Sequence, residues 1–166
     1  MNDALSFARE KLKNVTPLKT DCGRICGAKC CRSLEGEETG MLLFPGEDAY
    51  YREKPGWEIR ETESGPLLIC PGKCEREERP LACRIFPLMP VVRDGTVRAA
   101  ADQRARAVCP LARQGIRAMA PEFRAAVKEA GTALLAEEAQ RRFLERMTGE
   151  QDELKELRER LGDGDV

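Results

Sequence analysis

The segment CGRICGAKCC at residues 22–31 places four of the chain's eight cysteines within ten residues. The other four follow at Cys70, Cys74, Cys83 and Cys109, and the chain contains no histidine. Thiols gathered in this way are oxidised to disulfides, used as redox nucleophiles or bound to a soft metal. The choice among these three uses decides both the fold and the function.

Disulfides are the least favoured of the three. Residues 1–10 show neither the apolar stretch nor the small-residue cleavage site of a secretory signal. No apolar run approaches the roughly 18 residues of a membrane span, so no membrane association is expected. We therefore expect a cytoplasmic protein, and in a reducing compartment clustered cysteines favour metal binding. The adjacent Cys30 and Cys31 would also need two separate disulfide partners.

Length and composition indicate a single domain spanning residues 1–166 with a modest apolar core, because 34% of the residues are charged and only 5% are aromatic. A metal that cross-links distant segments would then contribute directly to the free energy of folding. The formal net charge of −1 provides no overall attraction to nucleic acid or to anionic lipid, so neither partner is expected.

The chain divides into three regions. Residues 2–15 carry apolar side chains at helical spacing and predict a short amphipathic helix. Residues 16–112 hold every cysteine and most of the glycine and proline, which predicts a loop-rich region of short elements. Two hairpins are expected there, one from strands at 57–62 and 66–69 and the other at 91–97, where Asp-Gly suits a tight turn.

Residues 113–161 form the predicted helical region, which a short helix at 110–119 introduces. Residues 121–147 begin with proline and keep an apolar face, with a glycine at 131 as a weak point. The Thr-Gly pair at 148–149 predicts a break before a last leucine-bearing segment. The predicted fold class is α+β: a small loop-rich cysteine-cluster region with short hairpins, packed against N- and C-terminal helices.

The spacing of the first cysteines permits two local geometries. Cys22, Cys26 and Cys30 stand at i, i+4 and i+8, which would align them on one face of a helix. Gly23 and Gly27 favour instead a wrapped loop whose backbone N–H groups turn toward the sulfurs. Zinc sites tolerate this C-x3-C spacing and iron–sulfur loops more often use C-x2-C, so the spacing alone does not identify the metal.

The remaining cysteines have distinct expected settings. Cys31 is expected to point differently from Cys30, so the pair would serve two metals or would combine one ligand with one neighbouring thiol. Pro80 can begin a helix that places Cys83 near the positive end of its dipole. Cys109 precedes a proline and is expected at a helix N-cap. Both helix positions lower a thiol pKa and favour the metal-binding thiolate.

We predict that the metal ligands come from all the cysteines: Cys22, Cys26, Cys30, Cys31, Cys70, Cys74, Cys83 and Cys109. Four thiolates on one Zn²⁺ carry a net charge of roughly −2, which nearby cations would offset. The candidate cations, about half of them expected to be ordinary surface charges, are Arg24, Lys29, Arg32, Lys73, Arg76, Arg79 and Arg84.

Three acidic residues are candidate oxygen ligands or helix caps. Glu47 and Asp48 begin a predicted short helix, and capping that helix is favoured over reaching a metal. Asp102 lies near the last cysteine, and both roles remain open for it.

The cysteine segments resemble the YkgJ-type cysteine-cluster family. The resemblance rests on residues 22–31, on Cys70 and Cys74, and on RPLACRIFP at residues 79–87, and it covers about residues 20–112. It implies a domain that chelates zinc or iron, and flagellin lysine N-methylase is similar through the same cysteines. This chain departs from the family pattern by having three residues, not two, between its first cysteines. The resemblance implies metal binding without specifying a reaction.

Other chemistries find little support in the sequence. Without histidine, Ser–His and Cys–His catalytic pairs cannot form, and neither a G-x-G-x-x-G nor a P-loop pattern is present. We predict a metal-binding protein that holds an iron–sulfur cluster or zinc through cysteine thiolates. The alternatives are a protein-modifying enzyme resembling flagellin lysine N-methylase and a structural zinc module that contacts an unidentified protein partner. All-thiolate coordination and the methylase resemblance favour iron–sulfur, whereas the C-x3-C spacing favours zinc.

Overall fold

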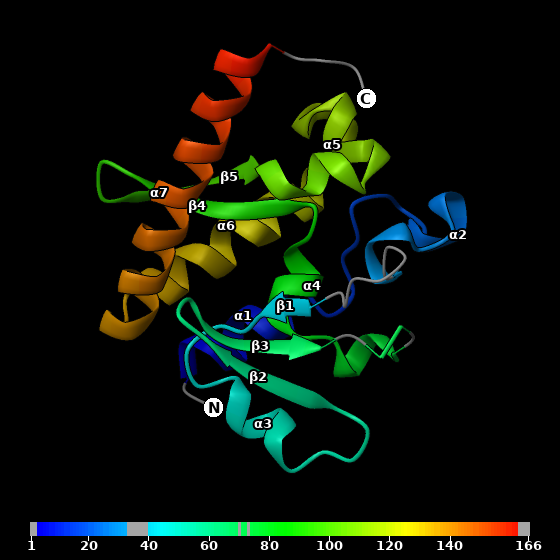
Figure 1. Cartoon of the computed structure of the whole chain (residues 1–166), viewed down its shortest axis with the longest axis vertical. Coiled ribbons are helices and arrows are strands. Elements are labelled where there is room, and N and C mark those ends of the chain that lie inside the picture. The colour runs from blue at the N-terminus through cyan, green and yellow to red at the C-terminus, as the bar shows by residue number, and fades with distance from the viewer. Residues whose placement is uncertain (1–2, 33–39, 70, 73, 163–166) are drawn as a thin grey trace.

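Helices occupy both ends of the chain, and two small antiparallel sheets lie between them in sequence (Figure 1). The computed structural model describes residues 3–32, 40–69, 71–72 and 74–162. The α-helices are α1 (Asp3–Lys11), α2 (Gly23–Cys26), α3 (Asp48–Arg52), α4 (Leu81–Ile85), α5 (Pro110–Gln114), α6 (Pro121–Leu135) and α7 (Glu138–Leu161). Short 3-10 turns are η1 (Lys29–Cys31), η2 (Arg76–Glu78), η3 (Gln103–Ala107) and η4 (Ile116–Ala118). The fold is α+β, as predicted.

The strands form two separate antiparallel sheets. They are β1 (Gly40–Leu42), β2 (Glu58–Thr62), β3 (Gly65–Ile69), β4 (Leu88–Arg93) and β5 (Thr96–Ala101). The first sheet has the order β1-β3-β2, and β4 pairs with β5 in the second. Both predicted hairpins are confirmed. In the second, Asp94 and Gly95 have φ angles of 51° and 70°, the paired positive values that a tight two-residue hairpin turn requires.

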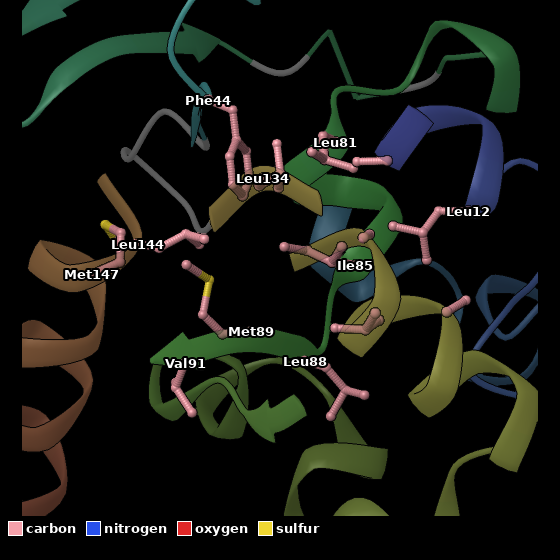
Figure 2. Close-up of a cluster of buried hydrophobic side chains, with 14 of the residues drawn as sticks. Leu12, Phe44, Leu81, Ile85, Leu88, Met89, Val91, Leu134, Leu144 and Met147 are labelled. Carbon is pink, nitrogen blue, oxygen red and sulfur yellow. The ribbon is translucent and has the colours of Figure 1, made fainter. Parts of the chain in front are cut away.

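The main hydrophobic core lies between the β4–β5 hairpin and the long helices. Helix α6 contacts α1, β4 and β5, and α7 contacts β4 and α6. Figure 2 shows Met89 of β4 pointing toward Leu144 of α7. Leu88 and Val91 of β4 and Leu134 of α6 belong to the same cluster. Side chains from α1 and α4 join the same cluster, so the element that carries Cys83 is anchored in the core.

Gly131 allows α6 to pack closely on the hairpin. A Cβ atom at this position would lie 2.5 Å from Cβ of Pro90 and 2.7 Å from Cγ1 of Val97. The glycine therefore removes a clash between helix and hairpin, and the helix continues through it to Leu135.

The predicted break at Thr148-Gly149 is wrong, because α7 runs through both residues. The Thr148 hydroxyl donates to the Leu144 carbonyl at 2.7 Å and accepts from the Val92 N–H at 3.0 Å, so it ties the helix to β4. The long helical pattern is interrupted earlier, between Leu135 and Glu138. Helix α7 then ends at Leu161, as the glycine that follows predicts.

Helix α1 is shorter than its apolar pattern predicts and ends at Lys11 instead of residue 15. The guanidinium of Arg76 binds the carbonyl oxygens of Leu12, Lys13 and Val15, which takes these acceptors out of any further helical turn. This contact also holds η2 beside the end of α1.

The three-stranded sheet has its own small core. Leu43, Tyr51 and Leu68 are buried together, with Trp57 and Ile59 packed against them. Helix α3 contacts β2 and β3, and α4 contacts β1. The sheet is therefore placed beside the helix that carries Cys83. No helix in the described part of the chain is long and apolar enough to cross a membrane.

Candidate metal centre

The first cysteine segment forms a wrapped loop and not one continuous helix. Helix α2 makes a single turn, and Gly27 and Ala28 then adopt positive φ angles of 66° and 53° that reverse the chain. The Ala28 N–H bonds to the Gly23 carbonyl at 2.8 Å, which closes the loop before η1 begins. In Figure 1 this loop lies across the molecule from α7. Of the two geometries permitted by the sequence, the loop is therefore observed.

Cys83 and Cys109 occupy their predicted helix positions. Cys83 is the third residue of α4, which begins directly after Pro80. Cys109 is the N-cap residue of α5, with Pro110 at the start of that helix, and its backbone N–H binds the Ala105 carbonyl at 2.7 Å. Both thiols lie near the positive end of a helix, although each helix has only five residues and thus a weak dipole.

All seven described cysteines line two adjoining cavities. We call the first the strand-side pocket, because β1 and β3 form part of its wall; its volume is about 60 Å³ and its cysteines are Cys30, Cys31, Cys74 and Cys83. We call the second the helix-side pocket, because α2 and α5 border it; its volume is about 140 Å³ and its cysteines are Cys22, Cys26, Cys30, Cys83 and Cys109. Each pocket can hold several water-sized groups, which is enough for a metal ion.

The two pockets meet at four shared side chains: Cys30, Arg79, Cys83 and Phe86. Two thiols, one guanidinium and one aromatic ring thus separate the cavities. The gathering of cysteines that the sequence predicts is observed for every one that the structure describes. Cys70, the remaining predicted ligand, lies outside the described residues.

The thiol donors suit a soft metal, but the sulfur atoms of the described cysteines are spaced too widely to coordinate one ion together. Within residues 3–32, 40–69, 71–72 and 74–162, no three cysteine or carboxylate side chains lie close enough together to hold a metal ion as they stand. The Sγ atoms of Cys30 and Cys31 lie 4.0 Å apart. Side-chain rotation would have to draw further sulfurs together around an ion.

Cys30 and Cys31, which the sequence predicts to point differently, share one pocket and differ in the other. Both thiols line the strand-side pocket, and their Sγ atoms are in hydrogen-bonding contact. Only Cys30 also lines the helix-side pocket, because the 3-10 turn places it next to α2. The two adjacent thiols can therefore serve one ion together, while Cys30 alone reaches both pockets.

The cysteines influence one another's protonation. The hydrogen bond from Cys31 lowers the pKa of the Cys30 thiol, against the opposing effects of burial and of nearby Cys22 and Cys26. Burial raises the pKa of Cys22, and the neighbouring Cys26 raises it further. Several thiolates packed together repel one another, so a cation is needed to hold them all in the ionised form.

Three of the predicted cations border the cavities. Arg79 lines both pockets, and Arg76 and Arg84 line the helix-side pocket. Arg24, Lys29 and Arg32 are exposed, and Lys73 lies outside the described residues. The exposure of these three residues agrees with the prediction that about half of the candidate cations are ordinary surface charges.

The predicted oxygen ligands have other partners. Glu47 does not cap its own helix, which contradicts the favoured role; it accepts from the Leu81 N–H at 2.8 Å and so caps α4 instead. Asp48 pairs with Arg52 across one turn of α3. Asp102 caps η3 through the Arg104 N–H at 2.9 Å, which resolves its role in favour of capping.

Asp21, which was not predicted from the sequence, also lines the helix-side pocket. It accepts from the Gly23 N–H at 3.0 Å and thereby fixes the start of α2. An acid directly before the first cysteine, followed by glycine, is the pattern of a local turn and could have indicated this role.

A buried polar network, also missed, holds α4 in place. The Glu47 carboxylate is fully buried and pairs with the guanidinium of Arg9, which is 8% exposed. Tyr51 donates to the Glu78 carbonyl at 2.7 Å, and Arg84 donates to the carbonyls of Arg9 and Glu77 at 2.9 and 2.7 Å. Burial raises the pKa of both Glu47 and Tyr51. The network joins α1, α3 and η2 to the helix that carries Cys83.

No family model, curated protein or solved structure matches the chain. The resemblance to the YkgJ-type family therefore stays a prediction, and the site has to be interpreted from its own geometry.

Proposed function

We propose that the protein binds one or two metal centres through cysteine thiolates. The observation that carries this proposal is that all seven described cysteines line two adjoining cavities that share Cys30 and Cys83. Metal chelation uses three or four thiols at one site, whereas a thiol–disulfide exchange site uses two. Four described cysteines border the strand-side pocket and five border the helix-side pocket, which supports chelation.

The residues around the thiols support the same function. Arg79 faces both cavities, and a cation beside several thiolates lowers the cost of gathering their negative charge. Glu47 and Arg9 brace α4, so Cys83 is presented from a helix fixed in the core. Rigid support of this kind fixes the orientation of a ligand and is typical of residues behind a metal site.

For the metal itself we favour an iron–sulfur cluster over zinc. The chain has no histidine, and thiolate-only coordination is the usual setting of such clusters. The zinc alternative is a structural module with Cys₄ sites, which the same thiols could form. The protein-modifying alternative rests on the resemblance to flagellin lysine N-methylase alone. A reducing compartment such as the cytosol would keep the thiols available for any of these roles.

Metal analysis of protein purified without oxygen tests the proposal. We expect bound iron with a nearly equal amount of acid-labile sulfide, a brown colour and visible absorption that bleaches on reduction. Cys83→Ser should lose metal, because Cys83 borders both pockets, whereas Arg24→Ser, at an exposed position of the first cysteine segment, should keep it. Colourless protein with bound zinc would select the zinc alternative. Protein that binds neither metal after anaerobic reconstitution would disprove the proposal.

A further inference from the structure

Arg79 occupies an unusual place between the two cysteine pockets. It is one of the four side chains that line both, and it is the only charged residue among those that the structure assigns to the wall of the strand-side pocket. The other shared residues are Cys30, Cys83 and Phe86, so the boundary between the cavities carries two thiols and a single positive charge.

The guanidinium of Arg79 already interacts with thiols on both sides. It hydrogen-bonds to Cys74 and interacts electrostatically with Cys31, both in the strand-side pocket. It also interacts with Cys22, which lines only the helix-side pocket, and there it favours the thiolate. A guanidinium stays charged at any physiological pH, so Arg79 places a permanent positive charge between the two pockets.

One hydrogen-bond donor of Arg79 is unpaired within the described part of the chain. It is the buried Nε of the guanidinium. Leaving a buried N–H unpaired is unfavourable, so such a group is expected to serve an acceptor at some stage of the protein's function. A metal-bound thiolate or sulfide beside it would be such an acceptor.

The two neighbouring arginines, Arg76 and Arg84, donate their hydrogen bonds to backbone carbonyl oxygens. Arg76 donates to the backbone carbonyls of Leu12, Lys13 and Val15, and Arg84 donates to those of Arg9, Glu77 and Arg79. Their donors hold segments of the chain together. Arg79 instead directs a hydrogen bond at the sulfur of Cys74, whereas Arg76 adds only an electrostatic interaction with Cys22.

We propose that Arg79 is a positioning residue for the metal centre, which donates hydrogen bonds to the ligating sulfurs and balances the negative charge of both pockets. This inference rests on the proposed function. Partners behind the ligands orient them and typically change metal affinity by about 10- to 100-fold. The planar guanidinium can serve two sulfurs at once, which the compact ammonium of a lysine does less well.

The test measures Zn²⁺ affinity of reduced, metal-free protein by competition with a chelator. Arg79→Met should bind Zn²⁺ about 10- to 100-fold more weakly, and Arg79→Lys should recover part of the loss because it restores the charge. Arg24→Met, an exposed arginine of the first cysteine loop, should bind like the wild type. Thermal unfolding of the metal-free variants checks that the fold is kept.

Wild-type affinity in folded Arg79→Met would overturn the inference while leaving metal binding intact. Equal loss in Arg79→Lys and Arg79→Met, with an unfolded Arg79→Met, would also overturn it, because the role would then be structural. A wild-type protein that binds neither zinc nor iron would overturn the proposed function together with this inference.

Discussion

Replacing Glu47 with leucine should strongly destabilise the protein, because Glu47 is the buried partner of Arg9. The carboxylate is fully buried and Arg9 is only 8% exposed, so the substitution leaves a guanidinium charge unpaired in the interior. Breaking a buried pair by removing one partner costs about 3–5 kcal/mol. The Leu81 N–H also loses its acceptor, and an unsatisfied buried N–H costs a further ~1–3 kcal/mol. We expect the free energy of unfolding to fall by at least about 4 kcal/mol.

Urea unfolding of the metal-free protein, followed by circular dichroism, measures this loss. With a slope of about 2 kcal/mol per molar urea, the midpoint should fall by at least about 2 M. Asp48→Ala is the matched control, because this neighbouring carboxylate is paired with Arg52 at the surface and should cost about 0–1 kcal/mol. Arg9→Met combined with Glu47→Leu should lose much less than the sum of the single changes, because no charge is left unpaired.

A Glu47→Leu midpoint as close to the wild type as that of Asp48→Ala would refute the reasoning. It would mean that the Arg9 guanidinium reaches solvent in the variant and that the network does not fix α4.

Three further predictions concern the metal and the packing. Chelating the metal should lower the melting temperature strongly while leaving the C-terminal helices partly formed, as circular dichroism would show; an unchanged melt after verified metal removal would contradict it. Cys30→Ser should lose more bound metal than Cys31→Ser, because Cys30 borders both pockets and Cys31 only one; equal loss in metal analysis would instead indicate that the pair is divided between two centres. Gly131→Ala should lower the free energy of unfolding by about 1–3 kcal/mol despite alanine's better helix propensity, because its Cβ would clash with Pro90; urea unfolding at or above wild-type stability would contradict the close packing.

Local signals in the sequence predicted the short elements well. Asp94-Gly95 marked a hairpin because few other pairs accept two positive φ angles, and Pro121 marked the start of α6. The helix break predicted at Thr148 is absent because the Thr148 hydroxyl accepts a hydrogen bond from Val92 of β4, 56 residues away in the chain. Propensity describes a residue alone and cannot anticipate such a contact.

The candidate site was predictable in composition but not in arrangement. Clustered thiols without histidine indicated one or two metal centres, and every described cysteine lines one or both of two adjoining cavities. The division into two cavities depends on how α4 packs beside β1, which places Cys83 between them. The pairing of Glu47 with Arg9 spans 38 residues and involves two ordinary charged residues, so no local pattern points to it.

X-ray absorption at the edge of the bound metal tests metal binding through thiolates most directly, because it reports the atoms that touch the metal. We expect a first shell of sulfur alone, at about 2.3 Å if the metal is zinc, and a second shell of iron neighbours if it is a cluster. The same measurement on Cys83→Ser should show fewer sulfur neighbours per metal or no bound metal. A first shell made mainly of nitrogen or oxygen in the wild-type protein would contradict the proposed thiolate centre.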